Sequence, residues 1–168
     1  MQTVEQWMSQ KPRTCTSRDP LDGVARVMWE HDCGVVPVVD AEAKLVGMVT
    51  DRDLCMAAWT RGCALHELVV ETAMTKKVAS CRASDTLADA ARAMKKARVR
   101  RLPVLDRADK LVGILSINDL VRAWATHERG GIEADTLAES LSEICAPRGG
   151  LVKRETPAIE PRVPVGAS

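Results

Sequence analysis

The order of hydrophobic and polar positions along the chain predicts the same set of elements twice. Each half has a short extended piece and a stretch of apolar residues at helical spacing. Two short aliphatic runs separated by a turn follow, and a second helical stretch ends the half. The expected elements are an extended piece at 14–16 and 78–80, a helix at 19–31 and 85–97, two strands at 35–39 and 45–49 and at 101–105 and 111–115, and a second helix at 51–61 and 117–128. The pattern therefore predicts two β-α-β-β-α units, with Met28 and Trp29 on the apolar face of the first helix.

The two halves are also related residue by residue. Residues 74–120 align with residues 8–54 at a constant offset of 66 without a gap, and seventeen of the forty-seven aligned pairs are identical. Two copies at a fixed spacing predict a pseudo-twofold domain rather than an open solenoid. Because the sheet of one copy is too small to bury both faces alone, the copies are expected to pack against each other. The predicted fold class is α+β (mixed α/β), with two β-α-β-β-α repeats packed sheet to sheet about a pseudo-twofold axis.

The repeats divide the chain into four parts. The first repeat with its linker is expected at 1–70 and the second repeat at 71–130. A C-terminal helix is expected within 131–146, and the proline-rich stretch 147–168 has no periodicity and is expected to be a flexible tail.

Two segments outside the repeats carry apolar residues. The linker 61–73 is expected to bring four aliphatic side chains close to the second copy, namely Leu65, Leu68, Val69 and Val70. The helix at 134–144 has an apolar face formed by Leu137, Leu141 and Ile144. That face is expected to dock on the module or on a second subunit.

Composition disfavours several classes of function. The formal net charge of +1 gives no electrostatic reason to expect nucleic acid or an anionic membrane as a partner. Phe and Tyr are absent and Trp occurs four times, which disfavours RNA modules that stack bases on surface aromatics. No apolar stretch approaches the roughly 20 residues of a membrane helix, and residues 2–10 lack the apolar run of a signal peptide. A cytoplasmic protein without a nucleic-acid or membrane partner is therefore expected.

The six cysteines are expected to be reduced structural residues. No two of them form a C-x-x-C pair or stand at zinc-finger spacing, and the three histidines are isolated, so no metal site is predicted. Four cysteines lie in segments typical of small buried thiols: Cys15, Cys33, Cys55 and Cys81. Cys63, beside Gly62 in an expected loop, is the candidate for a redox role.

The clearest chemistry lies where the last strand of each copy meets the following helix. Both copies have the frame Gly-aliphatic-aliphatic-[Thr/Ser]-x-x-Asp-Leu, with Thr50 and Asp53 in the first copy and Ser116 and Asp119 in the second. A hydroxyl at a helix N-terminus lies beside free N–H groups and the positive end of the helix dipole, which favours a phosphate. A carboxylate one turn later can accept hydrogen bonds from the two hydroxyls of a ribose. The same spacing is also a capping box, which stabilises only the helix start, but its recurrence in both copies favours nucleotide binding.

These stretches resemble the tandem cystathionine-β-synthase (CBS) domain pair, or Bateman module. The resemblance covers about residues 4–128 and rests on 34–40 and 46–54 in the first copy and on 99–106 and 112–120 in the second. In that family the hydroxyl and carboxylate hold the phosphate and ribose of an adenosine ligand. The aliphatic residue two positions before the hydroxyl lines the adenine pocket, and basic residues before the Leu-Pro pair contact phosphates. The resemblance implies a ligand site formed by Met48, Thr50, Asp53, Arg100, Arg101, Pro103, Ile114, Ser116 and Asp119.

The two copies differ most in basic residues. Four arginines of the second copy, Arg98, Arg100, Arg101 and Arg107, align in the first copy with Asp32, Gly34, Val35 and Ala41. Charge-assisted hydrogen bonds from arginine to phosphate are strong, so the second site is expected to bind phosphorylated ligands more tightly. The first site is expected to bind more weakly, to prefer an uncharged adenosyl compound or to stay empty. A solvated basic face that binds nothing is the alternative.

The resemblance implies a regulatory module rather than an enzyme. Its ligand would be an adenine nucleotide (AMP, ADP or ATP) or S-adenosylmethionine, no cofactor would be obligatory, and ligand-dependent conformational change would act through homodimer contacts or on an unidentified regulated protein. No G-x-S-x-G, P-loop or H-E-x-x-H motif indicates catalysis. Two alternatives stay open, namely a dimerisation scaffold without a ligand and a thiol- or metal-based sensor.

Overall fold

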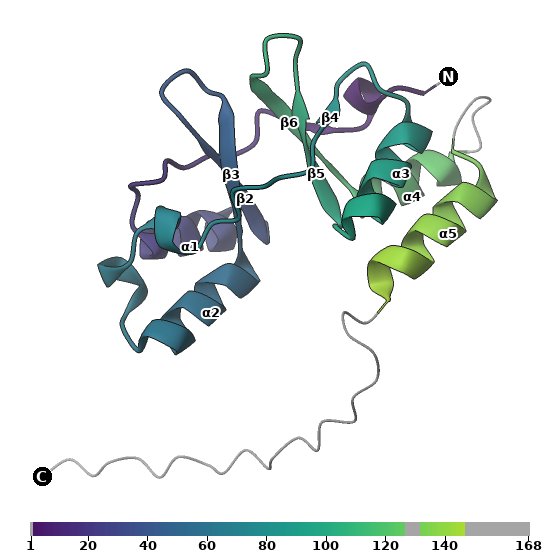
Figure 1. Cartoon of the computed structure of the whole chain (residues 1–168). Helices are drawn as coiled ribbons and strands as arrows, with labels where there is room; N and C mark the ends of the chain where they lie inside the picture. Colours follow the sequence, from purple (N-terminus) through teal and green to yellow (C-terminus); the bar gives the residue numbers. More distant parts are fainter. Residues whose placement is uncertain (1, 127–131, 147–168) are drawn as a thin grey trace, which may run out of the picture.

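The computed structural model describes residues 2–126 and 132–146, and Figure 1 shows how their elements are arranged. The elements follow in the order η1 (Val4–Gln6), β1 (Ser9–Gln10), α1 (Leu21–Glu30), β2 (Val35–Val39), β3 (Leu45–Thr50), α2 (Asp51–Arg61), η2 (Leu65–Glu67), η3 (Val70–Thr72), β4 (Cys81–Arg82), α3 (Leu87–Ala97), β5 (Arg101–Leu105), β6 (Leu111–Ser116), α4 (Ile117–Ala125) and α5 (Ala134–Cys145). Among these described residues, no helix has the length and hydropathy needed to span a bilayer.

The expected hairpins and helices are present in both copies. Their ends lie within two residues of the expected positions, except that α4 ends at Ala125. The extended piece expected at 78–80 was misplaced, because β4 forms at Cys81–Arg82, where Cys81 pairs in parallel with Val104 of β5. The predicted flexible tail at 147–168 lies outside the described residues.

Each sheet contains a segment that belongs, in sequence, to the other copy. The four-stranded sheet has the order β1-β6-β5-β4, and β1 from the first copy pairs with β6 of the second through Ser9 and Ile114. In the other half, Thr75 of the second copy forms an antiparallel bridge with Met48 of β3, with backbone hydrogen bonds of 2.8 and 3.0 Å. At the offset of 66, Ser9 is the equivalent of Thr75 and Met48 the equivalent of Ile114, so the same pairing occurs in both halves. The copies are therefore interlocked by crossing segments.

The contacts between the copies confirm the predicted pseudo-twofold symmetry. Lys44 forms an antiparallel bridge with Lys110, its own equivalent in the repeat, so the local axis passes between the two hairpins. Figure 1 shows these hairpins, β2–β3 and β5–β6, side by side. In β2 all residues from Val35 to Val38 are buried, although successive side chains point to opposite faces. Both faces of this small sheet are therefore covered, which agrees with the predicted mixed α/β fold.

The linker packs on the first copy, so the expectation that it approaches the second copy was wrong. Leu68 and Val70 are buried in the first hydrophobic core, and Leu65 packs against it. Hydrogen bonds of 2.9 Å, from the N–H of Leu21 to the carbonyl of Leu68 and from that of Val70 to the carbonyl of Asp19, hold the linker in place. The chain thus runs back along its own copy before it crosses over.

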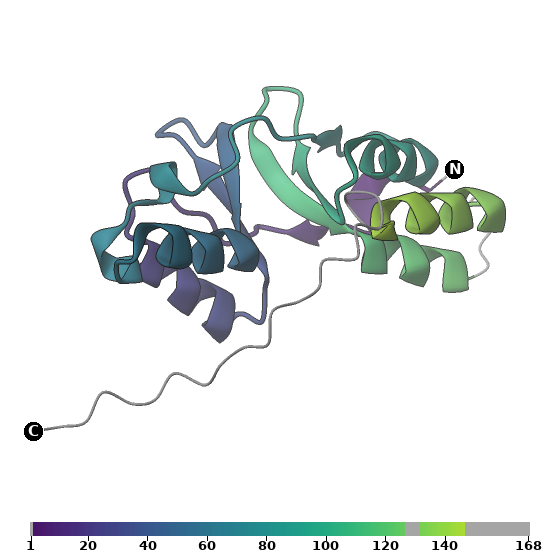
Figure 2. The same cartoon turned by 60° about the horizontal axis from the view of Figure 1, so that its bottom comes forward.

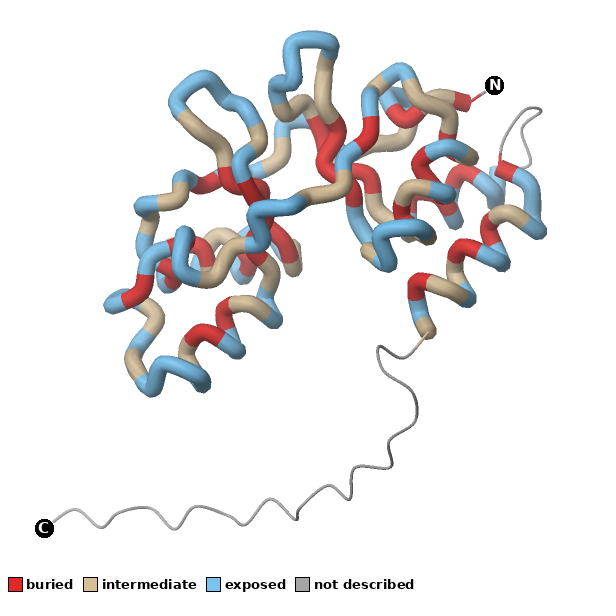
Figure 3. The backbone as a smooth tube through the Cα atoms, in the orientation of Figure 1, coloured by how far each residue is buried: buried red, intermediate tan, exposed pale blue. Residues whose placement is uncertain are grey.

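The helix α5 distinguishes the two halves. It packs on α3 and α4 of its own chain, as Figure 2 shows, with Leu137 and Ile144 buried in the second core. In the first copy the short η2, rather than a long helix such as α5, packs on both α1 and α2. Trp29 is consequently 89% exposed and Trp59 77% exposed, so the expected burial of Trp29 was wrong. Figure 3 shows exposed residues along α2 and buried residues in the hairpin β2–β3.

Candidate functional site

Helices α2 and α4 both begin with a capping box formed by the repeated frame. The Thr50 hydroxyl accepts a hydrogen bond from the Asp53 N–H at 3.2 Å, and the Asp53 carboxylate accepts one from the Thr50 N–H at 2.8 Å. The corresponding distances between Ser116 and Asp119 are 3.4 and 2.7 Å. Each hydroxyl also donates to carboxylate oxygen Oδ2, at 2.7 Å in α2 and 2.6 Å in α4. The capping geometry is therefore present in both copies, and it leaves oxygen Oδ1 of each carboxylate outside the box.

The two remaining carboxylate oxygens have different surroundings. Asp119 is only 3% exposed. Its Oδ1 atom forms an ion pair with Arg122, one turn further along α4. The equivalent of Arg122 in the first copy is Met56, whose side chain has no N–H group to donate. The Arg122 side chain is 67% exposed, so it can leave this pair at little cost. A ribose would therefore compete with the exposed Arg122 side chain for the Asp119 carboxylate, but it would meet no such competitor at Asp53.

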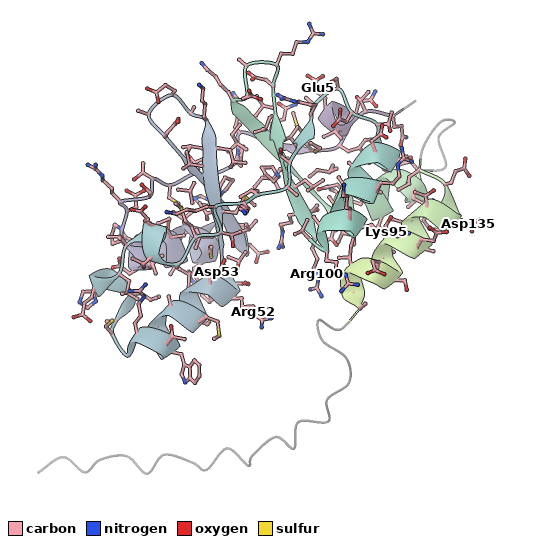
Figure 4. All side chains as sticks on the ribbon, in the orientation of Figure 1. Glu5, Arg52, Asp53, Lys95, Arg100 and Asp135 are labelled. Atoms are coloured by element: carbon pink, nitrogen blue, oxygen red, sulfur yellow. The ribbon has the colours of Figure 1, made fainter. Side chains whose placement is uncertain are left out.

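A cavity of about 380 Å³ opens beside the start of α4. It is lined by residues from three elements: Arg100 and Arg101 at the start of β5, Ser116, Ile117 and Asn118 at the start of α4, and Leu141 and Cys145 of α5. Among residues 2–126 and 132–146, neither Arg100 nor Arg101 takes part in an ion pair. Figure 4 shows Arg100 near the C-terminal end of α5. The cavity therefore combines two unpaired guanidinium groups, a hydroxyl and a helix N-terminus.

The structure brings only part of the predicted site together. Of the nine residues implied by the resemblance, Arg100, Arg101 and Ser116 line this cavity. The other six do not line it: Pro103, Ile114 and Asp119 belong to the second copy, and Met48, Thr50 and Asp53 to the first. Met48 pairs with Pro37 in the first hairpin, and Ile114 pairs with Pro103 in the second.

Sequence reasoning missed the contribution of α5 to the cavity. The apolar stripe of that helix predicted docking, but no signal in the sequence indicated that Leu141 and Cys145 would reach the start of α4. Ile117 and Asn118 were also missed as lining residues. They occupy the two variable positions of the [Thr/Ser]-x-x-Asp frame. Because these positions form the first turn of the helix, the frame itself could have indicated that they line the site.

The four arginines of the second copy point in different directions. Arg98 forms an ion pair with Glu143 of α5, with Nε to Oε1 at 2.8 Å, and is not a cavity residue. Arg107 is exposed in the turn between β5 and β6. Arg101 extends toward the first copy, since its Nη1 would lie 3.9 Å from a Cβ atom placed on Gly34. Only Arg100 and Arg101 therefore remain as candidates for a phosphate.

Two buried thiols occupy equivalent positions in the repeat. Burial raises the pKa of Cys15 to about 12, and the nearby Asp19 carboxylate adds to the rise. Burial likewise raises the pKa of Cys81 to about 12, with a contribution from Asp85. Because the thiolate is the reactive form, neither thiol is suited to redox or metal chemistry at neutral pH.

The other cysteines are more accessible. Cys55 is exposed where α2 faces the groove beside α1, so its expected burial was wrong, and Cys145 is exposed at the end of α5. Cys33 and Cys63 are half-buried. Over the described part of the chain, no group of three or more His, Cys, Asp or Glu residues could hold a metal ion.

N-ethylmaleimide at pH 7.5 is expected to modify Cys145 at least about a hundredfold faster than Cys15 and Cys81, because burial and a raised pKa suppress the thiolate of the last two. Peptide mass spectrometry over a time course measures each rate, and the same reaction in urea supplies the control in which the rates converge. Modification of Cys15 at the rate of Cys145 in the folded protein would contradict the assignment of the two buried thiols.

The chain is similar to proteins with known sequence and structure. The sequence profile described as CBS domain matches residues 4–59 and 69–126. The CBS domain-containing protein YhcV of Bacillus subtilis is 30% identical over 131 residues, which make up 78% of this chain and 91% of YhcV.

Two solved structures carry adenosine ligands. CBSX2 in complex with AMP is 31% identical and has a TM-score of 0.67, over 77% of this chain and 100% of CBSX2. The CBS domain pair of protein MJ0100, in complex with 5′-methylthioadenosine and S-adenosyl-L-methionine, is 25% identical and has a TM-score of 0.68. That likeness covers 76% of this chain and 99% of the MJ0100 chain.

Proposed function

The chain belongs to the CBS domain family, and on that premise we propose that it is a regulatory module that binds an adenine nucleotide and does not catalyse a reaction. The observation that supports this most strongly is the cavity that Arg100 and Arg101 share with Ser116 at the start of α4. Two arginines without ion-pair partners, beside the Ser116 hydroxyl and the positive end of the α4 dipole, form a suitable environment for a phosphate.

The carboxylate of the frame would bind the ribose. Asp119 lies one residue beyond Asn118, which lines the cavity, and Arg122 is exposed enough to release the Oδ1 atom of Asp119. Vicinal hydroxyls donate well to a carboxylate, because charge-assisted hydrogen bonds are about twice as strong as neutral ones. CBSX2 binds AMP, and the MJ0100 domain pair binds 5′-methylthioadenosine and S-adenosyl-L-methionine, which supports an adenosine ligand here.

The first copy is proposed to bind uncharged adenosyl compounds in preference to nucleotides. Gly34 and Val35 stand where the second copy has Arg100 and Arg101. Asp53 lacks the competing arginine that Asp119 has, which favours ribose hydroxyls at this carboxylate. The two sites would thus differ in the charge of the ligand that they select.

Regulation would follow from the interlocked packing of the copies. Arg101 belongs to the second copy and lines the cavity, and its guanidinium reaches toward Gly34 of the first copy, so a phosphate bound to Arg101 would act where the two copies approach each other. Such a ligand binds one arrangement of the copies better than another, and the equilibrium shifts by that difference in affinity.

Isothermal titration calorimetry with AMP, ATP, S-adenosylmethionine and adenosine tests the proposed function. We expect AMP to bind with about micromolar affinity, close to −8 kcal/mol. An Asp119→Asn variant should lose this binding, whereas the matched Asp53→Asn variant should retain it. Folded wild-type protein that gives no heat with any of the four compounds would overturn the nucleotide sensor and favour the scaffold.

A second copy of this chain is proposed to cover the exposed groove between α1 and α2. The groove is lined by Ala25, Met28, Trp29, Asp51, Leu54, Cys55, Ala58 and Leu65. The equivalent face of the second copy is covered by the apolar side of α5, which shows that such a helix pair can take an apolar cover. Since α5 occupies that face, the two chains would meet through their first copies.

Trp29→Asp is expected to weaken the dimer at least about 30-fold, because a buried tryptophan at an interface is commonly worth 2 kcal/mol or more. Sedimentation equilibrium over a concentration series measures the dissociation constant. Glu30→Ala, at the next residue of α1 and outside the groove, serves as the matched control and should not change it. Wild-type protein that sediments as a monomer throughout the series would contradict the proposed interface.

A further inference from the structure

The cavity beside α4 includes part of a helix that lies outside both repeats. Leu141 and Cys145 of α5 line this cavity. In the first copy the short η2, rather than a long helix, packs on α1 and α2. Leu141 and Cys145 are four positions apart, so they lie on the same side of α5 one turn from each other. The cavity therefore has a wall that the repeats do not supply.

Several contacts fix the position of this wall. Leu137 and Ile144 are buried in the second core, which anchors the helix along its length. Glu139 pairs with Lys95 at 3.0 Å, and Glu143 pairs with Arg98 at the end of α3. These contacts hold the last turn of α5, and with it Cys145, at the edge of the cavity.

We propose that α5 is part of the second ligand site, and that Leu141 and Cys145 limit it to ligands the size of a nucleoside monophosphate. Arg100 and Arg101 supply positive charge, whereas Leu141 and Ile117 supply apolar surface, which suits a phosphate joined to a nucleoside. A volume of about 380 Å³ lies at the small end of the roughly 300–1,000 Å³ of ligand pockets. The wall therefore selects AMP over ATP, an inference that rests on the proposed function of this cavity.

A bulky residue on the wall tests the proposal directly. Cys145→Trp, at an exposed position, should fill the cavity and weaken AMP binding in calorimetry at least tenfold. The matched Ser142→Trp variant, on the same turn but outside the cavity, should bind AMP like the wild type. Leu141→Ala, which shortens the wall, should raise the affinity for ATP relative to that for AMP.

Protection of the wild-type thiol supplies a second measurement. Saturating AMP should slow the reaction of N-ethylmaleimide with Cys145 at least fivefold and leave the rate at Cys55 unchanged. AMP binding that is lost in Asp119→Asn but is unaffected by Cys145→Trp, together with no protection of Cys145, would overturn the role of α5 while the proposed function stands. No AMP binding by the folded wild-type protein would overturn both.

Discussion

Replacing both Arg100 and Arg101 by alanine is expected to lower the affinity for AMP about 100-fold or more, with no change in the affinity for adenosine. Both arginines line the cavity, and neither takes part in an ion pair in the described part of the chain. A hydrogen bond to a charged group is worth about 1.5–3 kcal/mol. Since about 1.4 kcal/mol is a factor of ten in affinity, two such contacts account for the expected loss.

Adenosine is the matched control ligand, because it lacks only the phosphate. Arg107→Ala is the matched control variant, since Arg107 is exposed in the turn between β5 and β6 and outside the cavity. Calorimetry on the three proteins measures both affinities. An equal loss of AMP and adenosine affinity in the double variant would mean that the arginines support the fold of the site rather than bind phosphate. Unchanged AMP affinity would contradict their role altogether.

The substitution Gly113→Ala is expected to destabilise the protein by about 1–3 kcal/mol, the usual range for overpacking a filled site. A Cβ atom at this position would stand 2.5 Å from the Met8 sulfur and 3.0 Å from the backbone oxygen of Ser9. Met8 can move, but the Ser9 oxygen belongs to β1, which crosses from the first copy to pair with β6. The added methyl group would therefore push the crossing segment away from the sheet.

A glycine-to-alanine substitution in α1 should instead raise the stability of the protein. At Gly23 in α1, an added Cβ would make only an ordinary contact of 3.8 Å with Pro20, and alanine is favoured over glycine in a helix by about 1 kcal/mol. Gly23→Ala should therefore stabilise the protein slightly. Urea denaturation followed by tryptophan fluorescence measures both changes. A Gly113→Ala variant as stable as the wild type would contradict the close crossing at β6.

The repeat itself predicted the elements of both copies. The short aliphatic runs separated by a turn located the hairpins, and the helical spacing of apolar residues located α1 to α4. The crossing of Ser9 and Thr75 could not be predicted in the same way. An interlocked pair and a pair of separate copies bury the same positions, so the hydrophobic pattern does not distinguish them.

The linker and the tryptophans show a similar limit. Leu68 and Val70 are apolar whichever core they enter, and only the backbone pairing with Asp19 and Leu21 places them on the first copy. Trp29 has the correct spacing for burial, but within the described part of the chain no element covers its face. The helical spacing indicates an apolar face but does not specify which element covers it.

The candidate site was predictable only where its residues lie close together in the sequence. The frame located Ser116 and Asp119 at a helix start, because the chemistry lies within four consecutive residues. The basic residues before the Leu-Pro pair pointed to Arg100 and Arg101, which the fold brings beside Ser116. The wall from α5 was not predictable, since it depends on the angle at which that helix docks.

A crystal structure of the protein grown with AMP is the measurement that tests the central claim most directly. The account predicts the phosphate between Arg100 and Arg101 beside the Ser116 hydroxyl, with the ribose on Asp119 and Arg122 turned away. A crystal with saturating AMP in which this cavity is empty, or in which AMP lies at a place remote from Ser116, would contradict it.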